Sequence, residues 1–303
     1  AGSIQKICTK YPQMQIVSNA KVFGMMPQFF DFDLTGRTIT VKEGDTLSLG
    51  SHTLAFVMAP MVHWPEVMVT YEASEKILFS ADGFGKFGAL SVEEDWTDEA
   101  RRYFINIVGK YGAQVQNLLK KAATLDIAMI CPLHGPVLKE DLGYYIGKYL
   151  TWSSYEPEED GIVIACASIH GNTKRAMMKF AEILKEKGAE NVKFFDLSRD
   201  DMAEAIAEAY QYSKLVVACP TYDGVLFPCM EDFLYHLKIK NFQNRKAAIV
   251  ENGTWAPVAG KQMRAYLEGM KNITLVEPTV TIKSTMSEKN LEELNALADA
   301  LLA

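Results

Sequence analysis

The feature that most constrains this chain is an apolar run near its middle that leads through a small polar loop into an amphipathic helix. Gly161–Ala167 has the composition of a short buried strand, and Lys174–Lys187 carries apolar residues at helical spacing. The loop between them, Ser168–Thr173, suits a phosphate because the first N–H groups of a helix lack partners and its dipole favours an anion there. An ordinary turn capped by Asn172 or Thr173 would have the same pattern, so this loop alone leaves both interpretations open.

Two later loops decide between these interpretations. Cys219–Pro228 and Glu251–Pro257 each come directly after a short apolar run. In an open parallel sheet, such loops leave the carboxyl ends of the strands and converge on one crevice. The first loop offers phosphate donors, and the later two each offer an aromatic ring, from Tyr222 and Trp255. The sequence therefore predicts a pocket for a flat aromatic cofactor that ends in a phosphate.

These loops resemble those of a flavodoxin module. The match is good for Ser168-Ile-His-Gly-Asn-Thr173 and for the Pro-Thr-Tyr loop, whereas the third loop, with Pro257 and few glycines, is a looser match. The cofactor that the resemblance implies is FMN, with His170 packing near the flavin rather than acting in catalysis. The cofactor-binding residues so implied are Ser168, Ile169, His170, Gly171, Asn172, Thr173, Pro220, Thr221, Tyr222, Asp223, Gly224, Asn252, Gly253, Thr254 and Trp255.

Composition sets the broad class. A chain of 303 residues is long enough for two domains, and its net charge of −7 is spread so that neither half is basic, which argues against nucleic acid and anionic membranes as partners. No apolar run approaches the length of a membrane helix, and no signal peptide is recognisable. The five cysteines are scattered, without a CxxC, as expected of reduced core residues in a cytoplasmic protein.

The order of expected elements divides the chain in two. Short strands dominate up to about residue 82, and a helical stretch is expected over Asp98–Ala123. The polar segment Ser154–Asp160 is the clearest shift in composition, which places the boundary between domains 1–153 and 154–303. After it, strands and helices alternate, which predicts right-handed βαβ units and a parallel sheet.

Three residues of the first half are candidate metal ligands. His63, Asp82 and His134 each lie just beyond an expected strand, in loops rich in glycine or proline that can present a side chain at a sheet edge. Taken singly, each has an ordinary explanation, as a loop histidine beside proline or an Asp-Gly turn.

Together their loops resemble those of the metallo-β-lactamase fold. His-Trp-Pro, Ser-Ala-Asp-Gly-Phe-Gly and Pro-Leu-His-Gly-Pro are similar to motifs of its flavodiiron branch, which joins that fold to a C-terminal flavodoxin domain. The fold class so implied is α/β: a partial αββα lactamase-like domain followed by a doubly wound parallel sheet. The resemblance makes His63 a ligand of one iron, His134 of the other, and Asp82 the bridge between them. The family's HxExDH loop is absent, so we expect an N-terminally incomplete protein with a partial ligand set for two iron ions.

The resemblance implies an oxidoreductase. Electrons from rubredoxin or a flavin reductase would pass through FMN to a diiron site that reduces dioxygen to water or nitric oxide to nitrous oxide, usually in a head-to-tail homodimer. With the partial ligand set, we expect little diiron activity. One alternative is an FMN-binding electron-transfer protein whose β-rich half is structural and metal-free. A zinc hydrolase with an appended flavodoxin ranks lowest, because its flavin would have no task.

Overall fold

The computed structural model describes residues 2–303, which form two compact units. The first unit comprises the chain up to Trp96 together with Tyr111–Leu150, and the second comprises Thr97–Lys110 and Thr151–Ala303. The composition-based boundary between residues 153 and 154 stays a prediction.

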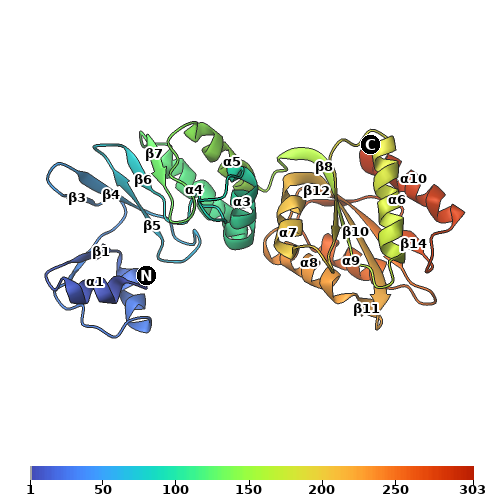
Figure 1. The fold of residues 1–303 in the computed structure, drawn as a ribbon, viewed down its shortest axis with the longest axis horizontal. Coiled ribbons are helices and arrows are strands. Elements are labelled where there is room, and N and C mark those ends of the chain that lie inside the picture. Colours follow the sequence, from blue (N-terminus) through green and yellow to red (C-terminus); the bar gives the residue numbers. More distant parts are fainter. Residues whose placement is uncertain (1) are drawn as a thin grey trace. The chain divides into compact units, whose positions relative to one another are not determined.

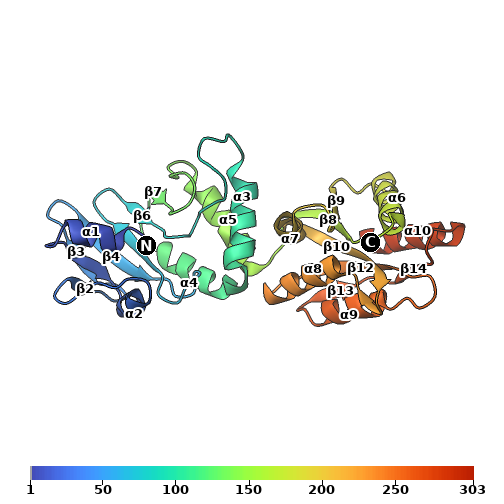
Figure 2. The same ribbon diagram turned by 60° about the horizontal axis from the view of Figure 1, so that its bottom comes forward.

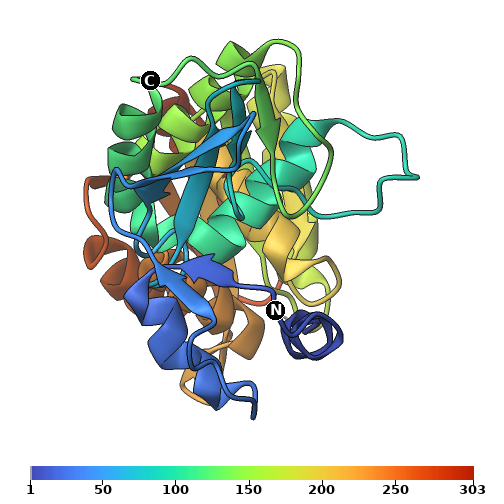
Figure 3. The same cartoon turned by 90° about the vertical axis from the view of Figure 1, so that its left-hand side faces the viewer.

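The first unit is built on a five-stranded mixed sheet in the order β3-β4-β5-β6-β7. Neighbouring strands are antiparallel except β6 and β7, which run parallel, and β1 and β2 form a separate parallel pair. Figure 3 shows the early strands of this unit in shades of blue, β7 in green and the long loop after β6 in teal. The strands are β1 (Ile16–Ser18), β2 (Thr38–Thr40), β3 (Thr46–Ser48), β4 (Thr53–Met58), β5 (Met68–Glu72), β6 (Ile77–Phe79) and β7 (Met129–Cys131). The helices are α1 (Ile4–Lys10), α2 (Ala20–Met25), the 3₁₀ turn η1 (Met26–Gln28), α4 (Gly112–Ala122) and α5 (Leu142–Ser154).

The helix expected over Asp98–Ala123 is interrupted. It divides into α3 (Trp96–Tyr103), a π-helical turn η2 (Phe104–Val108), a 3₁₀ turn η3 (Gly109–Tyr111) and α4. Glycine lowers helix propensity by about 1 kcal/mol relative to alanine, and one glycine begins η3 while another begins α4. The break therefore falls where the sequence supports an α-helix least.

The second unit contains a parallel sheet in the order β13-β12-β10-β8-β9. The short β14 extends it beside β12, and β11 turns back antiparallel on β10. Its strands are β8 (Glu159–Cys166), β9 (Val192–Asp196), β10 (Tyr212–Tyr222), β11 (Val225–Leu226), β12 (Arg245–Asn252), β13 (Ile273–Leu275) and β14 (Val280–Ile282). Its further helices are α6 (Asn172–Glu186), α7 (Met202–Gln211), α8 (Pro228–Ile239), α9 (Ala259–Glu268) and α10 (Glu288–Leu302).

Helices cover both faces of this sheet. Figures 1 and 2 show α6 and α10 on one face and α7, α8 and α9 on the other. Because both faces are covered, the central strands are apolar throughout: every residue of β8 from Gly161 to Cys166 is buried. Side chains of α6 and α10, among them Phe180 and Leu297, share one core with inward-facing residues of β8, β10 and β12.

The strand order confirms the predicted fold of the second half. The chain reverses direction across the sheet between β8 and β10, and this doubly wound order is the flavodoxin-like one. Within residues 2–303, no helix has the length and apolar character needed to cross a bilayer.

A buried ion pair holds α3 to the segment that precedes β8. The Arg101 guanidinium, 3 % exposed, contacts the Glu158 carboxylate through Nε and through Nη2 at 3.1 Å. Glu158 also accepts the indole N–H of Trp152 at 2.7 Å, and Arg101 donates to the exposed Asp98 at 2.9 Å. Burial alone would lower the pKa of Arg101, but its hydrogen bonds to Glu158 and Asp98 raise the pKa above its ordinary value, so the arginine stays charged.

Acid should weaken the first unit through Glu72. Burial opposes ionisation of this carboxyl, but the N–H groups of Glu75 and Ser74 donate to it and lower its pKa from 4.5 to about 2. The stabilisation is complete above the unfolded value and is lost as pH falls through the folded one. We therefore expect the urea midpoint to fall between pH 5 and about 2. Glu72→Gln should flatten this fall, and an equally steep fall in that variant would contradict the assignment.

Candidate functional site

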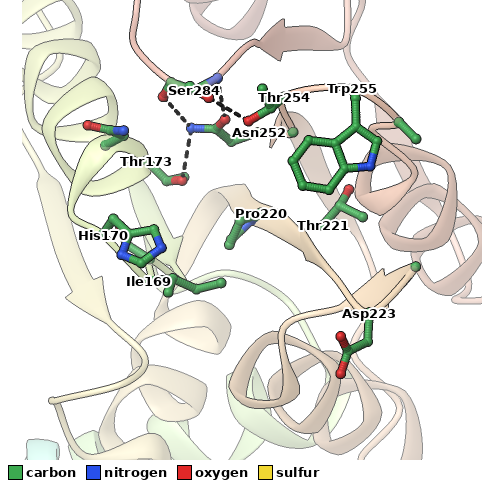
Figure 4. A pocket seen from close by; sticks show the side chains of 15 residues that line it. Ile169, His170, Thr173, Pro220, Thr221, Asp223, Asn252, Thr254, Trp255 and Ser284 are labelled. Carbon is green, nitrogen blue, oxygen red and sulfur yellow. Dashed lines mark hydrogen bonds between the residues drawn. The ribbon is translucent and has the colours of Figure 1, made fainter.

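A pocket of about 420 Å³ lies at the carboxyl ends of β8, β10 and β12, and we call it the strand-end pocket (Figure 4). Four loops contribute to it, one after each of these strands and a fourth after β14. Its lining residues are Ser168, Ile169, His170, Asn172, Thr173, Pro220, Thr221, Asp223, Gly224, Asn252, Gly253, Thr254, Trp255, Ala256 and Ser284.

The loop between β8 and α6 presents unpaired backbone donors. Gly171 is the N-cap residue of α6, has φ 83°, and leaves the helix without a side-chain cap. The N–H of Lys174 is bonded to the Ser168 hydroxyl at 3.3 Å, and the N–H of Arg175 to the Gly171 carbonyl at 2.9 Å. Within residues 2–303, the N–H groups of residues 169–173 have no hydrogen-bond acceptor. A helix N-terminus with free N–H groups is a site for an anion.

The loop after β10 is a tight hairpin. Asp223 and Gly224 form its two-residue turn with φ of 49° and 76°, and Tyr222 pairs with Val225 across it. Positive φ at both positions is the type I′ pattern that Asp-Gly favours. Just before the turn, the Thr221 hydroxyl accepts the N–H groups of residues 258 and 259 at 2.9 and 3.2 Å, so it holds the start of α9 against the pocket.

Asn252 ties the third loop to the other two sides of the pocket. Its side chain, 6 % exposed, donates to the Thr173 hydroxyl at 3.3 Å and to the Ser284 carbonyl at 2.9 Å. Its Oδ1 accepts the N–H of Ser284 at 3.0 Å, and the hydroxyls of Ser284 and Thr254 lie 2.5 Å apart. Figure 4 shows the amide of Asn252 between Thr173 and Ser284.

The structure brings together all but two of the residues that the sequence singled out for cofactor binding. Gly171 and Tyr222 do not line the strand-end pocket; the Tyr222 ring packs edge-on against Phe227, 5.4 Å between centroids. Trp255 does line it and is 90 % exposed. Sequence reasoning missed Ala256 and Ser284. Ser284 follows β14, Val280–Ile282. Recognising this short run as a strand would have been the sequence signal that identifies Ser284.

The strand-end pocket holds little charge. Asp223 and His170 are its only titratable lining residues, and no lysine or arginine lines it within the described part of the chain. Lys174, at the start of α6, instead pairs with Asp196 at 2.9 Å. Burial would raise the pKa of Asp196, but hydrogen bonds from Ser198 and Lys174 outweigh it and lower the pKa. Neutral donors are therefore what the pocket offers an anion.

The three candidate metal ligands of the first unit meet around one carboxylate. Asp82 Oδ2 lies 3.3 Å from His63 Nε2, and its Oδ1 lies 3.4 Å from His134 Nε2. Gly85 permits this approach, because a Cβ there would stand 3.1 Å from the carbonyl oxygens of both Asp82 and His134. The loops that follow β4, β6 and β7 thus bring all three side chains together.

This arrangement does not fit two metal ions. In residues 2–303, no group of three or more His, Cys, Asp or Glu side chains is arranged to hold a metal. Two metals would need about four ligands each, whereas His63, Asp82 and His134 offer three side chains in all. His52, which lies outside these three loops, pairs with Glu72 at 3.2 Å.

Comparison with known proteins gives a consistent result over the whole chain. Residues 1–135 match the model of the ODP family beta lactamase. A nitric oxide reductase of Moorella thermoacetica is 27 % identical over 100 % of this chain and 77 % of its own length. An uncharacterized protein of Methanocaldococcus jannaschii is 28 % identical over 84 % of this chain, and the match spans only 66 % of that relative.

Solved structures give the same result. The flavodiiron protein from Giardia intestinalis superimposes with a TM-score of 0.91 at 25 % identity, covering 99 % of this chain and 76 % of that one. Rubredoxin oxygen:oxidoreductase from Desulfovibrio gigas gives 0.90 at 24 % identity, covering 99 % and 77 %. These matches confirm the lactamase-like and flavodoxin-like folds expected for the two halves.

Proposed function

We propose that the chain is an oxidoreductase of the flavodiiron type that holds FMN in the strand-end pocket, a placement that its relatives and structural neighbours support. The observation that carries this proposal is the set of free N–H groups at residues 169–173, beside a cavity lined by Trp255. Its volume of about 420 Å³ falls in the range of small-molecule sites. The residues present therefore fit a phosphate-ended flavin.

Each side of the pocket has a separate task in this proposal. Residues 169–173 bind the phosphate with neutral donors, Asn252 fixes the loop opposite, and Trp255 covers the ring system. FMN, when bound, supplies the chemistry of accepting electrons in pairs or singly and passing them on singly. With Trp255 90 % exposed, the ring end of the pocket is the end open to a donor.

The substrate and partners follow from relatives and are proposals. The names of relatives include nitric oxide reductase and rubredoxin-oxygen oxidoreductase, which supports dioxygen or nitric oxide as electron acceptor and rubredoxin as donor. A flavin reductase as donor and a homodimer remain proposals from the family resemblance. The proposed contribution to a diiron site consists of His63, Asp82 and His134. These three side chains do not by themselves fit two irons.

Reconstitution tests the cofactor. The purified chain should be yellow, and after removal of the flavin it should take up one FMN per chain, measured by calorimetry and by quenching of flavin fluorescence. Thr173→Val should weaken this binding, whereas Lys187→Ala, on the exposed far end of α6, should not. A folded, colourless chain that binds neither FMN nor riboflavin would overturn the proposal.

A second candidate is an FMN-dependent electron carrier whose first unit holds no metal. It is favoured by the lack of a metal-binding group among the described residues. Metal analysis of the same FMN-loaded sample separates the candidates: bound iron supports the reductase, no metal supports the carrier, and zinc supports a hydrolase. Given three candidate ligands, we expect less than two irons and slow consumption of dioxygen or nitric oxide.

A further inference from the structure

We propose that Asn252 is a positioning residue that makes the Thr173 hydroxyl a hydrogen-bond donor, so that the strand-end pocket selects a terminal phosphate. The inference rests on the proposed FMN site and adds to it the group that sets its selectivity. Asn252 ends β12, beside β10 and β14, and Thr173 lies in the first turn of α6.

The orientation of the Asn252 amide is fixed by backbone. Ser284 N–H can only donate, and it donates to Oδ1 at 3.0 Å; the Ser284 carbonyl can only accept, and it accepts from Nδ2 at 2.9 Å. The remaining proton on Nδ2 therefore goes to the Thr173 hydroxyl, 3.3 Å away. If the amide were inverted, its oxygen would face the Ser284 carbonyl, acceptor against acceptor. Its NH₂ group would then face the Ser284 N–H, donor against donor.

This orientation decides what Thr173 can do. A hydroxyl that accepts from Asn252 keeps its own proton for another partner, and no acceptor for that proton is found among the described residues. Thr173 is 2 % exposed and lines the strand-end pocket beside the free N–H groups of residues 169–173. Its proton therefore joins a set that consists of donors alone.

A set of hydrogen-bond donors, with the Arg175 guanidinium beside it on the Asn172 side chain, discriminates by charge. A phosphate monoester offers acceptors to these donors, whereas a ligand that ends in a hydroxyl leaves the buried Thr173 donor without an acceptor, which is costly. The proposed selectivity is thus for flavin with a terminal phosphate over flavin without one. This selectivity depends on Ser284, which lies on the loop after β14. Thr173, by contrast, follows β8, and Asn252 ends β12.

The test is the ratio of two dissociation constants, riboflavin over FMN, measured on apoprotein. The wild type should prefer FMN strongly. Asn252→Ala should lower the ratio about tenfold or more, because the affinity for FMN should fall much further than the affinity for riboflavin. Asn252→Asp keeps an acceptor for the Ser284 N–H. The new carboxylate also accepts the Thr173 hydroxyl proton, which is then lost to the ligand, so the ratio should fall further.

Two comparisons separate this role from a structural one. In a Thr173→Val background, Asn252→Ala should lower the ratio no further, because the donor that it orients is gone. Asn290→Ala removes a bond to the Thr281 carbonyl that steadies the same β14–α10 connection, and it should leave the ratio unchanged. If Asn252→Ala fails to fold, the near-isosteric Asn252→Asp carries the test.

The outcomes distinguish the two proposals. Equal losses of FMN and riboflavin in the Asn252 variants, or a wild type that binds both flavins equally, would overturn the inference and leave the flavin site intact. A wild type that binds neither flavin would overturn the proposed function as well.

Discussion

Replacing Arg101 by methionine is expected to lower the free energy of unfolding of the second unit by about 3–5 kcal/mol. The loss leaves Glu158, whose side chain is 2 % exposed, as a buried carboxylate without its cation. The indole of Trp152 remains as a donor but carries no charge. Urea unfolding followed by circular dichroism measures the change.

Two variants control this prediction. Arg101→Met combined with Glu158→Leu should recover most of the stability, because both charges then leave the interior. Lys187→Ala breaks the surface pair with Asp299, which is 2.7 Å long but exposed on both sides, and should cost no more than about 1 kcal/mol. If Arg101→Met alone lowered the free energy of unfolding by no more than Lys187→Ala does, the buried pair would contribute little to stability.

Gly253→Ala is expected to weaken flavin binding about tenfold to hundredfold. A Cβ on Gly253 would stand 2.9 Å from Pro257 Cα and 3.0 Å from its Cβ, and neither atom belongs to a flexible side-chain end. The backbone of the third loop must shift, at the roughly 1–3 kcal/mol typical of overpacking. Thr254 and Trp255, which line the strand-end pocket, move with it.

This variant should differ from those at Asn252 in its ligand profile. A displaced loop removes contacts to the ring end, so FMN and riboflavin should both bind more weakly. Titration of apoprotein with each flavin gives the comparison. Gly143→Ala, in α5, has no positive φ and no atom within 4 Å of the added Cβ, so it controls for a general glycine effect and should leave flavin binding unchanged. Unaltered affinities in Gly253→Ala would show that the third loop adapts without loss.

Sequence reasoning succeeded where a pattern is local and repeated. The alternation of apolar runs and amphipathic helices after residue 160 gave the parallel sheet, because strands covered on both faces are apolar at every position. It failed where pairing is non-local. The runs Thr38–Val41 and Thr46–Leu49, separated by Lys-Glu-Gly-Asp, have the sequence pattern of two strands joined by a turn. In the structure, however, β2 pairs with β1 and β3 pairs with β4. Which strands pair depends on contacts that no short window contains.

The candidate site follows the same division. The residues after β8, β10 and β12 were identified because loops at the carboxyl ends of parallel strands converge. Ser284 was missed because β14 is three residues long and a proline-containing segment precedes it. The grouping of His63, Asp82 and His134 was expected, but the amide orientation of Asn252 depends on backbone groups of a distant loop, which sequence alone does not place.

The length of β10 has a consequence for how the cofactor would leave. This strand runs from Tyr212 to Tyr222 between β8 and β12, so the floor of the strand-end pocket lies at the carboxyl end of a central strand of the sheet. The walls, by contrast, are loops that carry exposed side chains such as Trp255. Amide protons of the floor should exchange with solvent only on global opening, whereas those of the walls exchange through small local openings. Flavin could therefore dissociate and return many times within the lifetime of one folded molecule.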